Sequence, residues 1–231
     1  MRRAMDLRTA LRSTGAVRTF RADPVSEDLV RQILEVARFA PSGGNRQGWR
    51  VIDVRDRDRR QTLRDCYLDA WVEYLAHLLA GVTPFSPLLT AADRSAVSQN
   101  LERARSHVAP DDFAARLDQV PALLVICADL GSLAATDRDL DRYTFIGGAS
   151  IYPFVWSILL AAHAEGLGGV MTTVATALEP RLRDVLRLPD EFAVAALVAL
   201  GHPESERTRL RRHEVDDFAT RDTFDGPPLE R

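Results

Sequence analysis

Apolar and polar positions follow two different periods along this chain, and the periods separate helices from strands. Between residues 26 and 39, apolar side chains recur every three or four positions, as at Leu29, Ile33 and Val36. That spacing places the apolar side chains on one face of a helix. The segment therefore predicts an amphipathic helix, which Pro41 brings to an end.

Four other segments have the composition of strands. They are short, rich in Val, Ile, Leu and Ala, and bounded by Gly, Pro or charged residues. These segments are residues 49–56, 122–130, 170–174 and 193–201. The sequence ALLVICADL (122–130) is apolar without interruption, which is typical of a strand buried on both faces.

A long apolar helix is predicted over residues 148–165, and Gly166 follows its end. Because it is apolar on nearly every side, it should be buried all round or packed against a partner subunit. A short helix at about 179–187 and a mostly helical stretch over 57–118 complete the pattern. Helices and strands mixed around one dominant helix predict an α+β or α/β fold.

Composition places the chain among ordinary globular proteins. It has 231 residues, 46% hydrophobic content, 27% charged content and a net charge of −3, which suits a single domain. That charge balance gives no reason to expect nucleic acid or an anionic membrane as a partner. We expect no membrane span and no signal peptide, and therefore a soluble, cytoplasmic protein.

The basic, thiol and imidazole residues narrow the chemistry. The sequence contains no lysine, so all 30 basic residues are arginine and lysine Schiff-base chemistry is excluded. Any phosphate group must be held by the planar fork of arginine. Cys66 and Cys127 are expected to be reduced thiols. The five histidines lack the spacing of metal ligands, so no metal site is predicted.

The loop APSGGNRQGW (40–49) combines two glycines with short amide and hydroxyl side chains. Gly43 and Gly44 remove every side chain from one spot, which indicates a tight turn or another object lying against the backbone. The simpler interpretation is a polar loop. The more specific one is a loop shaped around a flat ligand.

Three further stretches stand out: RSTGAVRTF (12–20), GLGGVMTT (166–173) and RTRLRR (207–212). Each is weak evidence by itself. Taken together and in this order, the four stretches resemble the FMN-dependent nitroreductase family. The family pattern APSxxNxQPW stands here as APSGGNRQGW, RRSVRxF as TGAVRTF, and GLGxxxxT as GLGGVMTT.

The resemblance covers about residues 7–58 and 120–218. It implies an α+β, nitroreductase-like fold of three layers, with a central mixed sheet flanked by helices. It further implies a single domain over 1–231 that forms a homodimer. Residues 59–118 match no family pattern and are expected to form a variable lid or insertion, and residues 205–231 a basic C-terminal tail.

The resemblance also implies FMN as the cofactor, together with the residues that bind it. These are Thr14, Gly15, Ala16, Val17, Arg18, Ser42, Gly44, Asn45, Thr172, Thr173, Arg211 and Arg212. Arg18 would face the N1 and C2 carbonyl of the ring, and Arg211 or Arg212 would hold the phosphate. Thr172 and Thr173 would lie beside N5. Thr173 is the residue to which a catalytic part is assigned.

This chain departs from the family pattern at two places. Thr14 and Gly15 stand where the family often has two arginines, which removes one expected phosphate cation, and Arg12 is a nearby replacement. Trp156 and Ser157 stand where the central helix commonly carries a polar amide. This second change fits either a closed flavin face or a repacked interface.

An enzyme of this family would take a hydride from NADH or NADPH and pass electrons to a nitroaromatic, a quinone or a similar small organic acceptor. The flavin supplies that chemistry, so no acid–base pair or nucleophilic triad is needed. Two alternatives stay open. One is another flavin reaction on the same scaffold, such as reductive dehalogenation or heterocycle oxidation, and the other is a non-enzymatic FMN-binding protein.

Overall fold

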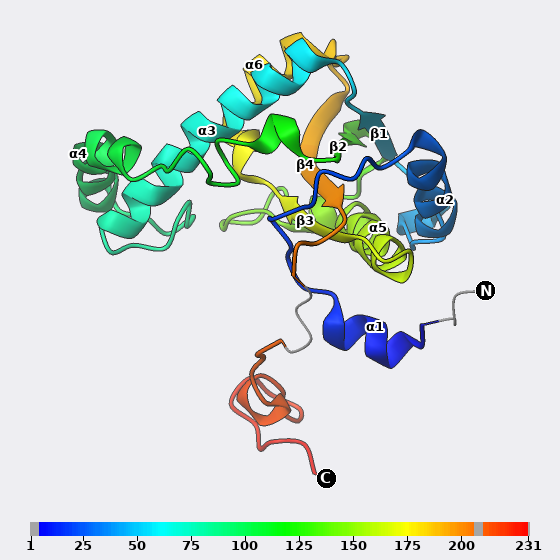
Figure 1. The fold of residues 1–231 in the computed structure, drawn as a ribbon. Helices are drawn as coiled ribbons and strands as arrows, with labels where there is room; N and C mark the ends of the chain where they lie inside the picture. The colour runs from blue at the N-terminus through cyan, green and yellow to red at the C-terminus, as the bar shows by residue number, and fades with distance from the viewer. Residues whose placement is uncertain (1–4, 206–209, 231) are drawn as a thin grey trace.

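A computed structural model of the chain describes residues 5–205 and 210–230 (Figure 1). Its helices and strands are α1 (Leu7–Ser13), α2 (Glu27–Ala37), β1 (Trp49–Asp53), α3 (Arg57–Leu79), α4 (Ala91–Ser106), β2 (Ala122–Asp129), α5 (Tyr152–Ala164), β3 (Gly168–Thr172), α6 (Glu179–Leu186) and β4 (Phe192–Gly201). The helix predicted at 26–39 and the strand predicted at 122–130 are confirmed, because α2 and β2 occupy these positions.

The four strands form one sheet in the order β1-β2-β4-β3, and each neighbouring pair is antiparallel. The expectation of a mixed sheet therefore does not hold for the strand pairs. The reason is the position of β4. The connection through α5 returns β3 in the same direction as β2, but β4 lies between them. Among the described residues, the parallel pairing that occurs is an isolated bridge between Ala16 and Gly169.

Helices cover both faces of the sheet and give the expected three layers (Figure 1). β2 shows why, because alternate side chains of a strand point to opposite faces. Leu124 and Ile126 belong to the apolar cluster that contains buried residues of α2 and α5. Leu123 and Val125 belong to the cluster that contains buried residues of α3 and α6. Burial on both faces thus explains the uninterrupted apolar run of β2.

The central helix is shorter than predicted. α5 begins at Tyr152, with Pro153 in its first turn, and a 3₁₀ turn over Ile146–Ser150 precedes it. Together they make a stretch, Ile146–Ala164, that is long and apolar enough to cross a membrane by length and composition, which the sequence reasoning did not expect. Buried residues of α5 such as Ile158 pack in the same apolar cluster as α2. In this fold α5 is therefore a core helix.

The stretch 59–118 consists largely of two packed helices. α3 and α4 contact each other through an apolar cluster of their own, which includes Val72, Ala76, Val97 and Ala104. Figure 1 shows α4 and the adjoining end of α3 standing away from the sheet. A helical hairpin of this kind can be held out from the body because it has its own small core.

The C-terminal tail is not basic along its whole length. Residues 205–231 contain six arginines and seven Asp or Glu residues, and four of the six arginines fall within 207–212. Arg207 and Arg209 lie outside the described residues. The described part forms a short 3₁₀ turn over Val215–Asp217 and stands away from the sheet (Figure 1).

Candidate cofactor site

Residues 12–20, which we call the N-terminal stretch, lie beside the glycines after α5 at the outer edge of β3. Ala16 forms a bridge with Gly169, and the Val17 N–H donates to the Gly169 carbonyl at 2.9 Å. A Cβ atom on Gly168 would stand 2.7 Å from Val17 Cγ2, which is too short for two carbon atoms. Glycine at 168 therefore permits this close approach.

The segment that leads to the C-terminal arginines contacts the same N-terminal stretch. A Cβ atom on Gly15 would stand 2.8 Å from Leu210 Cδ2, so the tail packs against the N-terminal stretch immediately before Arg211 and Arg212. Both arginines are exposed, and neither has a carboxylate partner in the described part of the chain. Arg209, in the same basic stretch, lies outside the described residues. Gly15, one of the two positions where the family often has arginine, is thus covered by the C-terminal tail, which carries arginines of its own.

Arg18 is exposed at the end of the N-terminal stretch. Within residues 5–205 and 210–230, neither Arg18 nor Arg12 has a carboxylate at ion-pair distance. Asp23, the nearest acidic residue in sequence, pairs with Arg21 at 3.0 Å instead. The guanidinium of Arg18 is therefore available to an anionic ligand.

Thr14 is engaged by the protein itself. Its side chain is 6% exposed, and its hydroxyl donates to the Ala10 carbonyl at 2.7 Å. The same carbonyl also accepts the Thr14 backbone N–H at 3.0 Å, so both donors of Thr14 are bonded at the end of α1. The Thr14 hydroxyl is consequently not available to a ligand, whereas Gly15–Arg18 are at least partly exposed.

The two threonines after the glycines have different surroundings. Thr172 is 8% exposed, and its hydroxyl lies 3.3 Å from that of Tyr67. Thr173 is exposed, and its hydroxyl has no hydrogen-bond partner among the described residues. The protein therefore holds Thr172, while Thr173 is free to donate to a ligand.

Tyr67 is a candidate residue that the sequence reasoning missed. It is 2% exposed, and its ring lies nearly parallel to Trp71 at 6.3 Å and edge-on to Phe113 at 5.8 Å. Burial raises the pKa of the Tyr67 phenol, while its hydrogen bond and the charge of Arg18 act in the opposite direction. The available signal was the spacing of Tyr67, Trp71 and Tyr74, which places them on one face of α3.

Internal hydrogen bonds shape the loop between α2 and β1. Positive φ angles of 59°, 53° and 51° occur at Gly44, Asn45 and Gln47. The Ser42 hydroxyl accepts from the Gln47 N–H at 3.0 Å, and the Gly43 N–H donates to Ser150 Oγ at 3.0 Å. The second bond ties the loop to the turn that precedes α5.

One copy of the chain does not bring this loop to the edge of β3. The loop is held at the start of α5 and Gly168 follows its end, and a helix of 13 residues is about 20 Å long. β1 and β3 are also opposite edges of the sheet. Within a single copy, the N-terminal stretch is therefore far from Ser42, Gly44 and Asn45.

A cavity of about 290 Å³ opens beside Arg18, and we call it the α3 cavity. Its lining residues are Arg18, Thr19, Tyr67, Trp71, Asp111, Asp112, Phe113 and Ala114. It therefore joins the N-terminal stretch to α3 and to the segment before β2.

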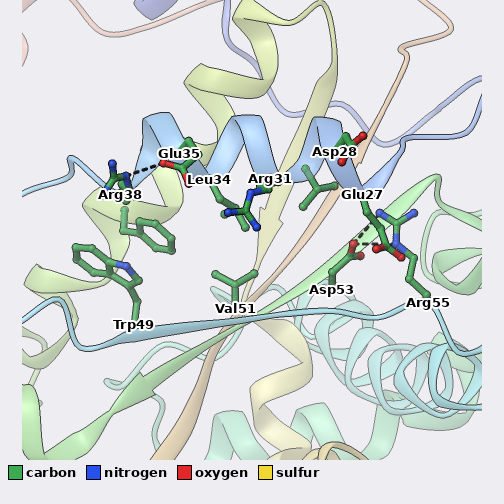
Figure 2. A pocket seen from close by; sticks show the side chains of 12 residues that line it. Glu27, Asp28, Arg31, Leu34, Glu35, Arg38, Trp49, Val51, Asp53 and Arg55 are labelled. Atoms are coloured by element: carbon green, nitrogen blue, oxygen red, sulfur yellow. Dashed lines mark hydrogen bonds and ion pairs between the residues drawn. The ribbon is translucent and has the colours of Figure 1, made fainter.

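A larger cavity of about 720 Å³ lies between α2 and β1 (Figure 2). Trp49 stacks on Phe154 at one end of it, with ring centres 4.5 Å apart, and Arg55 pairs with Asp53 at the other at 2.7 Å. None of the site residues predicted from the sequence lines this cavity. The predicted residues lie elsewhere, either near the edge of β3 or in the loop between α2 and β1.

The described residues form no assembled site for metal or thiol chemistry. No group of three or more His, Cys, Asp or Glu residues in residues 5–205 and 210–230 is placed to hold a metal ion. Cys66 and Cys127 are both buried and form no disulfide. Burial raises the pKa of the Cys127 thiol to about 11, which keeps it protonated.

Comparisons with known sequences agree on one family. The Nitroreductase family pattern matches residues 11–202. An NADH dehydrogenase from Thermus thermophilus is 32% identical over 204 residues, covering 87% of this chain and 89% of that protein. A nitrobenzene nitroreductase from Ectopseudomonas oleovorans is 28% identical over 224 residues, covering 91% of this chain and 94% of that protein.

The fold agrees with the sequence comparison. The crystal structure of an iodotyrosine deiodinase bound to FMN and 3-iodo-L-tyrosine matches with a TM-score of 0.64 at 20% identity, covering 95% of this chain and 100% of that one. The family match over residues 11–202 contains every strand of the sheet and the glycines at the edge of β3. The chain therefore belongs to the nitroreductase family.

Proposed function

We propose that this protein is an FMN-dependent oxidoreductase that takes a hydride from NADH or NADPH and passes electrons to a nitroaromatic, a quinone or a similar small organic acceptor. Its family and the names of its relatives support an NAD(P)H-dependent flavin enzyme. The observation that carries the proposal is a meeting of three segments at one edge of the sheet. Gly15–Arg18, Gly168–Gly169 and Leu210–Arg212 are far apart in sequence but adjacent in the fold.

The side chains at this edge fit the chemistry of FMN. Its phosphate requires cations, and Arg211 and Arg212 are exposed without carboxylate partners in the described chain. The pyrimidine edge of the ring carries oxygen acceptors, and Arg18 offers a free guanidinium to it. Thr173 adds a hydroxyl that no described residue occupies.

These residues would divide the work of binding and orientation. When bound, FMN supplies the hydride and electron transfer chemistry, so the protein needs no nucleophile of its own. Arg18 would stabilise the negative charge that reduction places on the N1–C2 edge, because its guanidinium stays charged at any working pH. Thr173 would donate a hydrogen bond near N5. Tyr67 would fix the preceding residue, Thr172, through the 3.3 Å contact between their hydroxyls.

We further propose a homodimer in which each cofactor site takes residues from both copies. Ser42 and Gly44 lie at the opposite end of α5 from the edge of β3, so they can border the same ligand only if they come from a second copy. A Cβ atom on Gly44 would stand 3.7 Å from Arg46 Nε, so the guanidinium of Arg46 lies over this glycine and would border such a ligand.

The outer face of α5 offers a surface for this dimer. Tyr152 and Trp156 are 40% and 38% exposed on an otherwise apolar helix. We therefore assign Trp156 to a repacked interface rather than to the flavin face. Light scattering at micromolar concentration tests the dimer, and a monomeric mass with flavin bound would contradict it.

One alternative reaction has an observation in its favour. The free hydroxyl of Thr173, placed near N5 in this proposal, would also suit single-electron steps such as those of reductive dehalogenation. Release of halide from a halogenated aromatic, without reduction of nitro compounds or quinones, would favour that alternative.

We also propose that the hairpin of α3 and α4 acts as the lid of the site. Tyr67 and Trp71 of α3 line the cavity beside Arg18, so this helix would border the acceptor. A cytoplasmic location is the matching expectation for the whole protein, and cell fractionation tests it.

The experiment that tests the cofactor is release and identification of the flavin. Heat denaturation of the purified protein should release FMN, which chromatography separates from FAD and riboflavin. A colourless protein that takes up no added FMN would contradict the proposed function.

A further inference from the structure

We propose that the α3 cavity selects planar aromatic acceptors with a neutral or cationic substituent over those with a carboxylate. This inference rests on the proposed function, because it assigns the acceptor of that reaction to the α3 cavity. The selectivity would come from two features of the lining: a fixed aromatic wall and an excess of carboxylates.

The α3 cavity borders the proposed ring site from two sides. Arg18, proposed to face the N1–C2 edge, lines the cavity directly. Tyr67 also lines it, and the Tyr67 hydroxyl contacts that of Thr172, the neighbour of Thr173. A small molecule in the cavity would therefore lie next to both the pyrimidine edge and N5.

The aromatic wall has a fixed orientation. Along α3, the ring of Trp71 is inclined by 13° to that of Tyr67 and by 8° to that of Tyr74. Phe113 closes the arrangement at 89° to Tyr67. Because Tyr67 is 2% exposed, its ring is held by its neighbours and cannot turn into solvent. Such a wall favours flat aromatic ligands, which can pack against the partly exposed ring of Trp71.

The charges around the cavity are not balanced. Asp111 is exposed and has no cationic partner in the described part of the chain, while Asp112 accepts a backbone N–H at 2.9 Å. The cation in this lining is Arg18, which the proposed flavin edge would occupy. An adjoining cavity of about 190 Å³ shares Arg18 and Asp111 and adds one charge of each sign, Arg116 and Glu204. An incoming acceptor would therefore meet net negative charge, which repels a carboxylate.

Three ligands of similar size separate charge from shape: benzoate, benzamide and benzamidine. Their affinities for the purified protein can be measured by isothermal titration calorimetry. We expect benzamidine to bind most tightly and benzoate most weakly. Asp111→Asn should lower the ratio of benzamidine affinity to benzoate affinity about threefold to tenfold, because it removes an exposed attraction for one ligand and an exposed repulsion for the other.

Two further variants separate the contributions. Asp225→Asn makes the same change of charge in the tail, outside the lining of the cavity, and should leave the ratio unchanged. Trp71→Leu should weaken all three ligands by a similar factor, about threefold to tenfold, because it removes stacking without changing charge. Thermal denaturation of each variant checks that it is folded.

The corresponding nitro compounds test selectivity during turnover. The kcat/KM for 4-nitrobenzamidine divided by that for 4-nitrobenzoate should fall in Asp111→Asn by the same factor as the affinity ratio. Comparing this quotient between wild type and variant cancels the intrinsic difference in reducibility of the two compounds.

Equal or tighter binding of benzoate, or a ratio that Asp111→Asn does not change, would overturn the proposal. A yellow protein that NADH or NADPH reduces but that prefers benzoate would refute the selectivity alone. A colourless protein that shows the expected order of affinities would refute the proposed oxidoreductase and leave the charge selectivity of the cavity standing.

Discussion

Replacing Arg18 with alanine should make the bound flavin harder to reduce. Reduction places negative charge on the N1–C2 edge that Arg18 is proposed to face. A guanidinium interacts more strongly with this anionic form than with the neutral oxidised form. Only that difference changes the reduction potential, because equal binding of the two forms would change affinity alone.

The surroundings of Arg18 set the expected size of the effect. Its side chain is exposed and has no carboxylate partner among the described residues, so its charge is not already compensated by the protein. A hydrogen bond to a charged group contributes about 1–3 kcal/mol. Since 1.4 kcal/mol corresponds to about 30 mV for a two-electron couple, the potential should fall by about 20–65 mV.

Anaerobic spectroscopic titration against a reference dye measures this potential. Arg21→Ala is the matched control, because Arg21 lies three residues from Arg18 and carries the same charge. Its guanidinium already pairs with Asp23 at 3.0 Å. The control should keep the wild-type potential. If Arg18→Ala binds FMN and also keeps that potential, Arg18 is a surface residue and the assignment is wrong.

Three further predictions concern binding and stability. Replacing Arg211 and Arg212 together with alanine should weaken FMN binding about tenfold or more, since charge-assisted bonds to phosphate are strong, and an unchanged Kd in a fluorescence titration would move this role to another arginine. Gly168→Ala should lower the free energy of unfolding by about 1–3 kcal/mol, because the new methyl group would collide with the N-terminal stretch, and an unchanged denaturation midpoint would contradict the packing. Hydrogen bonds from the Phe145 N–H and the Arg142 guanidinium hold the pKa of Asp137 below its usual range. The stability that the ionised Asp137 gives the fold is therefore present at neutral pH and is lost as pH falls. Asp137→Asn should therefore reduce the difference in Tm between neutral pH and about pH 3, and thermal melts that retain the full difference would contradict this.

The elements of the fold could be predicted where their signals are local. The spacing of Leu29 and Ile33 marks one face of α2, and the apolar run of β2 marks burial on both sides. The pairing of the strands could not be predicted in the same way. The position of β4 between β2 and β3 depends on contacts between distant segments, and no local period encodes it.

The site could be predicted only in part, for a similar reason. Gly15 and Val17 were recognised from a motif, and the structure places Gly15 beside Leu210 and Val17 beside Gly168. The buried hydroxyl of Thr14 was not foreseen, because its role at the end of α1 depends on where that helix stops.

Tyr67 shows a second limit of sequence reasoning. Its aromatic neighbours on α3 follow from helical spacing, but its contact with Thr172 joins residues 105 positions apart in the chain. No pattern within α3 indicates which side chain of another element its hydroxyl will meet.

The most direct test of the central claim is the absorbance spectrum of the purified protein before and after anaerobic addition of NADH or NADPH. The proposed function predicts the bands of oxidised flavin at the start and their loss in proportion to the nicotinamide added. A protein without a flavin spectrum even after addition of FMN, or a bound flavin that neither nicotinamide reduces, would contradict it.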